Sequence, residues 1–312
     1  MKIMWLVPSD MVIEWCVGSL ESLDHQHEVF THFYDKHGSP PDRAMLDAAE
    51  NFKPEVILYV SQAAGPWLAS PSTFRKLADR YKTVHLCLDA FDTGFTPLLE
   101  IYARGQCFTQ TVACDGGSAG PVDYVSFHPV DPRPYAHPGK RHAERTFSLG
   151  TCGGFPYGLR KEVCDRLVAN CSMVVKPREE KWGSYGRYAR FLGECRIVLD
   201  CALSAGGFDG KGPYARTLKT RAIEVGLAGA CLLELRGAAI ERYAGAANSR
   251  PHIKPDFVDY ETSEEAEEKV RLMLADPGFT QLLADRYAAK IRSKCSPRVF
   301  FDELGKRLGC VF

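Results

Sequence analysis

The sequence lacks the residue pairings and the long apolar runs that mark several common classes of protein. Its twelve cysteines include no Cys-x-x-Cys pair, which argues against a zinc site and against a disulfide scaffold. Several of them lie inside apolar runs, so we expect buried free thiols in a reducing compartment. No window approaches the roughly 20 apolar residues of a membrane span, and the apolar run within the first ten residues is too short for a signal peptide. We therefore expect a cytoplasmic protein.

The motifs of the commonest nucleotide and metal sites are also missing. The chain contains no Asp-x-Asp, a frequent way of holding a divalent ion beside a diphosphate. The segment 204–212 is not a Walker A loop, because Ala205 stands where a glycine is required and Gly212 replaces the Ser or Thr. It is not a G-x-G-x-x-G loop either, since Ala215 occupies the third glycine position. P-loop and nicotinamide chemistry are therefore disfavoured, and a loop without a ligand is as consistent with 204–212 as a phosphate-binding loop.

A net charge of one sign is absent as well. The chain has 39 Lys and Arg against 39 Asp and Glu, which argues against a protein that binds a polyanion over its whole surface. Residues 1–135 nevertheless contain 10 basic and 17 acidic side chains, and the remaining residues contain 29 and 22. We expect any anion to be bound by the second half. With 312 residues, 45% of them hydrophobic, the chain is long enough for about two domains.

What is present is an alternation of short apolar runs with helical segments. Runs such as EVILYVS and KTVHLCLD in the first half, and RIVLDCAL and ACLLEL in the second, are separated by stretches of helical periodicity. This alternation predicts an α/β fold with parallel sheets. The Pro-rich and charged residues 131–145 form the best linker candidate. We expect two doubly wound, Rossmann-like domains facing a cleft, at 1–138 and 139–285, with C-terminal helices at 286–312 that pack back on the first domain.

Two segments of the second half indicate an anion site. In FSLGTCGGFPYGLRKE, glycines follow an apolar strand and Arg160 and Lys161 open the next helix. A glycine-containing loop at the carboxyl end of a strand is the usual crevice position in an open α/β sheet. In TLKTRAIEVGLAG, Lys219 and Arg221 fall in the first turns of an expected helix. Cations are unfavourable at a helix N-terminus unless an anion binds there. A surface salt bridge between Arg221 and Glu224 is the alternative explanation.

The order of these motifs resembles the C-terminal half of GT-B glycosyltransferases. F-S-L-G-T, L-R-K-E and T-L-K-T-R-A-I-E-V-G-L-A-G-A-C-L-L follow one another as they do there, and the likeness is greatest to the spore-maturation CgeB-like group. V-S-F-H-P-V-D-P-R-P-Y is similar to the strand and linker that precede them in that group. The resemblance covers most of residues 120–300. It departs from the broader family at the paired glutamates spaced eight apart, because Glu224 matches the second and Arg216 replaces the first.

The resemblance implies a nucleotide-sugar donor bound by the second domain, most simply a UDP-sugar, with no other cofactor. It implies that Glu224 holds the ribose hydroxyls. The diphosphate would be held by Lys219, Arg221 and a turn at Gly150 and Thr151, with Arg160 nearby. Fixed cations and a helix N-terminus can neutralise the leaving diphosphate without a metal ion, so we expect metal-independent transfer.

If transfer inverts the anomeric configuration, a base must accept the proton of the acceptor hydroxyl. The first domain offers Asp10 and Glu14 after its first strand, and Asp89 and Asp92 in CLDAFD. We prefer Asp92, followed by Asp10, although Asp10 is equally suited to cap a helix and Asp89 and Asp92 to form a turn. If transfer retains configuration, no base is needed.

The sequence therefore predicts a glycosyltransferase that moves a sugar from a nucleotide-sugar to a hydroxyl acceptor. The acidic first half favours a glycan, peptide or small-molecule acceptor over duplex DNA. A glycosyltransferase that modifies DNA bases, a nucleotide-sugar epimerase and a non-catalytic nucleotide-sugar-binding protein remain as alternatives.

Overall fold

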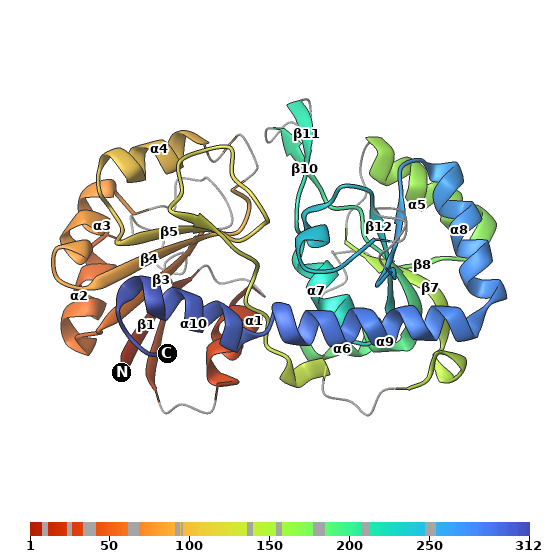
Figure 1. Cartoon of the computed structure of the whole chain (residues 1–312). Helices are drawn as coiled ribbons and strands as arrows, with labels where there is room; N and C mark the ends of the chain where they lie inside the picture. The colour runs from red at the N-terminus through yellow and green to blue at the C-terminus, as the bar shows by residue number, and fades with distance from the viewer. Residues whose placement is uncertain are drawn as a thin grey trace. The chain divides into compact units, whose positions relative to one another are not determined.

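The computed structural model describes residues 1–7, 12–23, 27–33, 42–61, 69–90, 94, 96–135, 140–153, 158–176, 185–206, 212–246 and 254–312, with the side chains of 12–14, 204–206 and 212–215 left aside. These residues form two compact units (Figure 1). Unit 1 comprises residues 1–131, 204–215 and 297–312, and unit 2 comprises residues 132–203 and 216–296. No helix in the described part of the chain is long and apolar enough to cross a membrane.

Unit 1 is built on a six-stranded sheet in the order β2-β1-β3-β4-β5-β6, in which every pairing is parallel. Its strands are β1 (Lys2–Val7), β2 (Glu28–Phe33), β3 (Val56–Ser61), β4 (Lys82–Cys87), β5 (Gln110–Ala113) and β6 (Tyr124–Val125). The helices between them are α1 (Val12–Glu21), α2 (Asp42–Phe52), α3 (Pro71–Ala78) and α4 (Thr96–Arg104). All six residues of β3 are buried, as expected for a central parallel strand that is covered on both faces.

The last helix of the chain, α10 (Pro297–Leu308), completes unit 1. Phe300 is buried and packs edge-on against Phe127, with ring centroids 5.8 Å apart. The Arg307 guanidinium lies 4.0 Å from the ring centroid of Tyr124, and Lys82 Nζ donates to Gly309 O. Residues nearly two hundred positions apart thus share one core.

Unit 2 is built on a five-stranded parallel sheet in the order β13-β12-β9-β7-β8. Its strands are β7 (Phe147–Cys152), β8 (Val174–Lys176), β9 (Cys195–Leu199), β12 (Cys231–Leu235) and β13 (Val258–Tyr260). Its helices are α5 (Gly158–Cys171), α6 (Tyr185–Glu194), α7 (Thr220–Leu227), α8 (Ser263–Ala275) and α9 (Pro277–Lys294), with short 3-10 turns η2 (Arg133–Tyr135), η3 (His142–Glu144) and η4 (Ala239–Arg242). The predicted α/β class with parallel sheets is confirmed.

The structure differs from the sequence expectation in three places. The segment expected to be a loop contains two strands, β10 (Leu203–Gly206) and β11 (Gly212–Arg216), which pair with each other. Strand β13 was not anticipated, because its three residues make too short an apolar run to stand out. The helix expected from Thr217 begins at Thr220, because Thr217 N donates to Ala202 O and holds that residue beside β9.

Candidate functional site

The carboxyl edge of the unit 2 sheet brings the N-terminus of α7 beside the end of β7. Gly153 follows β7 with φ = 103°, a conformation that favours glycine. A Cβ at this position would lie 2.8 Å from Arg221 Nη2, so the guanidinium lies directly against the backbone. Lys219 is the N-cap of α7, with φ = −88° and ψ = 147°, and its side chain makes no capping hydrogen bond. Two cations therefore stand at a helix N-terminus, where anions bind.

Arg221 is fixed by a carboxylate behind it. Its Nη1 donates to Asp200 Oδ1 at 3.0 Å, and Asp200 is fully buried directly after β9. Burial alone would lower the pKa of Arg221, but Cys152 and Asp200 raise it, so the guanidinium stays charged. The carboxylate paired with Arg221 is Asp200, and Glu224, on which the charge of Arg221 also acts, is buried and not part of a surface salt bridge.

Glu224 is buried among tyrosines. Tyr185 donates to its Oε1 at 2.9 Å and Tyr188 to its Oε2 at 2.7 Å, and the hydroxyl of Tyr135 lies 2.8 Å from that of Tyr185. Burial raises the pKa of Glu224, and the bonds from Tyr188 and Tyr185 offset part of that rise. Tyr188 also interacts with Arg221. A chain of polar contacts thus links Glu224 to Arg221 and Asp200.

A second buried carboxyl group, Glu234, lies within β12 next to Asp200. Its Oε1 accepts from Ala202 N at 3.1 Å and from Leu235 N at 2.7 Å. Burial, and the charge of Asp200 beside it, raise the pKa of Glu234 well above its usual range. Asp200 and Glu234 were not among the residues singled out from the sequence. The available signal was a lone acidic residue within or directly after an apolar strand, in ACLLEL and RIVLD.

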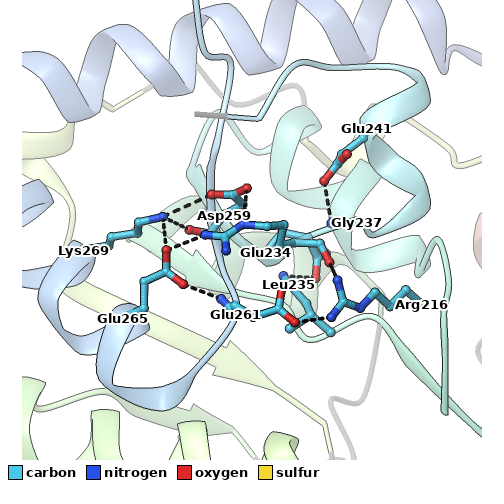
Figure 2. A network of polar contacts seen from close by, with 10 residues as sticks. Arg216, Glu234, Leu235, Gly237, Glu241, Asp259, Glu261, Glu265 and Lys269 are labelled. Carbon is cyan, nitrogen blue, oxygen red and sulfur yellow. Dashed lines mark hydrogen bonds and ion pairs between the residues drawn. The ribbon is translucent and has the colours of Figure 1, made fainter. Parts of the chain in front are cut away.

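Arg216, which stands in place of a glutamate, belongs to a separate ionic network (Figure 2). Its guanidinium pairs with Glu261 and donates to Arg236 O. Arg236 in turn pairs with Asp259 and Glu265, and Lys269 contacts the same two carboxylates. The network ties the ends of β11, β12 and β13 to α8, so Arg216 has a structural role whether or not it meets a ligand.

Two predicted diphosphate contacts take a different position from the one expected. Gly150 and Thr151 form no turn, because β7 continues through Cys152. A Cβ on Gly150 would lie 2.4 Å from Cys195 Sγ, so this glycine permits close packing. Thr151 is fully buried and donates to Leu199 O at 2.9 Å. The turn begins at Gly153, and it is this residue that contacts Arg221.

The other predicted residues fall into two groups. Arg160 is half-buried in the first turn of α5, where its charge acts on Cys201 at the end of β9. Asp89 is half-buried in the turn after β4. Asp10 and Asp92, the two base candidates, lie outside the described residues, as does the side chain of Glu14.

In the described residues no group of three His, Cys, Asp or Glu is arranged to hold a metal ion.

A Ser–His contact in unit 1 has no place in this site. Ser61 Oγ lies 2.6 Å from His85 Nε2, and both residues are fully buried. Burial lowers the pKa of His85 to about 3, so the imidazole is neutral. The pair satisfies two polar groups inside an aromatic core that includes Tyr59 and Phe108.

The architecture of two parallel-sheet α/β units is the GT-B fold of glycosyltransferases. The structure of HepE from Anabaena with UDP and glucose matches with a TM-score of 0.63 and 12% identity over 99% of both chains. An α-glucosyltransferase bound to UDP and a mismatched 13-mer DNA matches with a TM-score of 0.65 and 11% identity, over 99% of both chains. A glycosyltransferase from Rickettsia africae matches with a TM-score of 0.60 and 10% identity, over 98% of both. No family model and no curated protein sequence matches the chain.

Proposed function

We propose that this protein is a metal-independent glycosyltransferase that moves a sugar from a UDP-sugar to a hydroxyl acceptor. The observation that carries the proposal is the pair of cations, Lys219 and Arg221, at the N-terminus of α7 beside Gly153. Transfer expels a nucleoside diphosphate, and its developing charge is stabilised by cations and helix N–H groups that are already in place. Structural neighbours that bind UDP or UDP-glucose support the choice of donor.

We assign the remaining donor contacts on the same basis. Glu224 would accept hydrogen bonds from the ribose hydroxyls. Its two oxygens offer about four acceptor positions, two of which the tyrosines use. Arg160 would add a cation from the N-terminus of α5. Within the fold, we infer a likeness to the CgeB-like group, which the sequence of the segments around Arg160 and Glu224 supports.

The acceptor we propose is a glycan, a peptide or a small molecule. The densest basic run of the first half is engaged within unit 1: Arg75 Nε donates to Gly105 O, Arg80 pairs with Glu50, and Lys82 donates to Gly309 O. If transfer is inverting, Asp92 or Asp10 would be the base. A DNA acceptor is the second candidate, because neighbours of the same fold were crystallised with DNA. We infer a reducing, cytoplasmic setting from twelve cysteines that are all free thiols.

A thermal-shift screen tests the donor. UDP-, GDP-, TDP- and CDP-sugars are added at equal concentration. A ligand at a hundred times its dissociation constant stabilises the native state by about 2.7 kcal/mol. We expect the largest increase in melting temperature with a UDP-sugar. When no acceptor is present, the protein should also release UDP slowly from that donor. A flat response to all four classes would refute the proposal, and binding without release in any acceptor mixture would indicate a non-catalytic protein.

A further inference from the structure

Two buried carboxyl groups of unit 2 are neighbours in the sheet. The parallel pairing of β9 with β12 sets Leu199 opposite Leu233, so Asp200 and Glu234 are the next residues along the two chains. Both side chains are fully buried. Each uses one oxygen, Asp200 Oδ1 and Glu234 Oε1, to accept hydrogen bonds.

The other oxygen of each group has no donor. Asp200 Oδ2 and Glu234 Oε2 are buried, and no N–H or O–H of the described residues reaches them. Among the described residues, Arg221 is the cation that pairs with Asp200. By contrast Asp259, the fully buried carboxylate of the neighbouring network, has two cations, Arg236 and Lys269 (Figure 2). Two ionised carboxylates beside one guanidinium would leave one buried charge uncompensated, which is strongly unfavourable.

A single proton resolves both problems. Bound between Oδ2 and Oε2, it satisfies both orphaned oxygens and leaves the pair with one negative charge, which matches Arg221. We propose that Asp200 and Glu234 share one proton, and that the ionised Asp200 so maintained is the positioning residue that holds Arg221 at the diphosphate site. The second part rests on the proposed function, and the first does not.

The surroundings favour this charge state. Tyr260 on β13 donates to Asp200 O, and Tyr287 on α9 packs near both carboxyl groups. Cys201 follows Asp200, and Arg160 on α5 acts on Cys201. The pKa of Cys201 and those of Tyr260 and Tyr287 are raised by burial, so these groups are neutral and add no negative charge to the pair.

The shared proton makes stability depend on pH in a defined direction. In the unfolded chain both carboxyl groups lose their protons by about pH 5.5. Burial and the charge of Asp200 raise the pKa of Glu234, so the native state keeps a proton that the unfolded state releases. Stability from this source is complete below the unfolded pKa values and falls as the pH rises toward the folded one. The unfolding equilibrium constant therefore increases about tenfold per pH unit from this pair.

Glu234→Gln is the isosteric test. The amide nitrogen takes the place of the protonated oxygen and donates to Asp200 Oδ2 without binding a proton. Urea unfolding of wild type and variant at pH 5.5, 6.5 and 7.5 should give a ratio of unfolding constants, wild type over variant, that rises about tenfold per pH unit. All other titrating groups cancel in the ratio. Asp200→Asn should remove the same pH dependence of the unfolding constant. If Glu234→Gln does not fold, the ratio can be measured with Asp200→Asn.

Glu265→Gln is the matched control in the same unit. Burial raises the pKa of Glu265, but hydrogen bonds from Lys269, Glu261 N and Arg236 outweigh it and lower the pKa to about 2. This group is ionised in the native and unfolded states above pH 5.5, so the ratio of unfolding constants, wild type over Glu265→Gln, should not change with pH. A flat ratio for Glu234→Gln or Asp200→Asn as well would overturn the shared proton.

The positioning role is tested with UDP itself. Both variants keep the charge of the pair at minus one, but Glu234→Gln leaves it on Asp200, whereas Asp200→Asn moves it to Glu234, away from Arg221. By calorimetry we expect the Kd for UDP of Glu234→Gln to stay within about twofold of wild type, and that of Asp200→Asn to rise about tenfold or more. Equal affinities would overturn the positioning role alone. Wild type that binds no UDP would overturn the proposed function, and the stability ratios would still decide the proton.

Discussion

Lys219→Ser should stabilise the protein and weaken nucleotide binding at the same time. Lys219 is the N-cap of α7 without a capping side chain, which is a poor residue at that position. A serine hydroxyl there accepts a hydrogen bond from the N–H of Arg221 or Ala222, worth about 1 kcal/mol. Removing a cation from the positive end of the helix adds roughly 0.3–1 kcal/mol. We expect the free energy of unfolding to rise by about 1–2 kcal/mol in a urea titration.

The same substitution removes one charge-assisted bond to the diphosphate. Such a bond contributes about 1.5–3 kcal/mol, so the Kd for UDP should rise roughly 10- to 150-fold in calorimetry. Lys219→Arg is the control: it keeps the charge, should bind UDP nearly as wild type does, and should gain no stability. If Lys219→Ser is stabilised and binds UDP unchanged, the anion site is not at this helix. If Lys219→Ser is destabilised, the Lys219 side chain has a structural role in addition to its position at the N-cap.

Three further predictions concern Arg221, the metal requirement and the acceptor. Arg221→Ala should weaken UDP binding by a similar factor and lower the free energy of unfolding by roughly 3–5 kcal/mol in urea, because it leaves Asp200 buried without its cation; unchanged affinity in both Lys219 and Arg221 variants would exclude the site. Turnover should persist after exhaustive chelation with EDTA, and activity that is lost and then restored by Mn²⁺ or Mg²⁺ would contradict metal independence. Duplex DNA should not bind with sub-micromolar affinity in a mobility-shift titration, because unit 1 contains 13 basic and 20 acidic side chains. Tight binding with a steep salt dependence would favour a DNA acceptor. It would do so more strongly if binding were lost when the basic run is changed to alanine, namely Arg75, Lys76, Arg80 and Lys82.

The sequence was most informative where one local pattern determines the structure. The apolar run of β3 predicts a buried strand without reference to the rest of the chain, and the cations of TLKTR indicate an anion site from helix electrostatics alone. The partners of Glu224 and Arg221 could not be predicted in this way. Tyr135, Tyr185 and Asp200 come from a 3-10 turn, a helix and a strand end, and only the tertiary fold brings their side chains together.

Unit 1 cannot complete its fold in the order in which its residues are synthesised. Chains fold during synthesis from the N-terminus, and the six strands of this unit emerge before any strand of unit 2. Yet the face that receives Phe300 stays uncovered until α10 has been made, after the whole of unit 2. Every nascent chain therefore carries an exposed apolar surface while residues 132–296 are being made. A truncation before residue 297 would make that transient state permanent, so unit 1 cannot be obtained by cutting the chain at its linker.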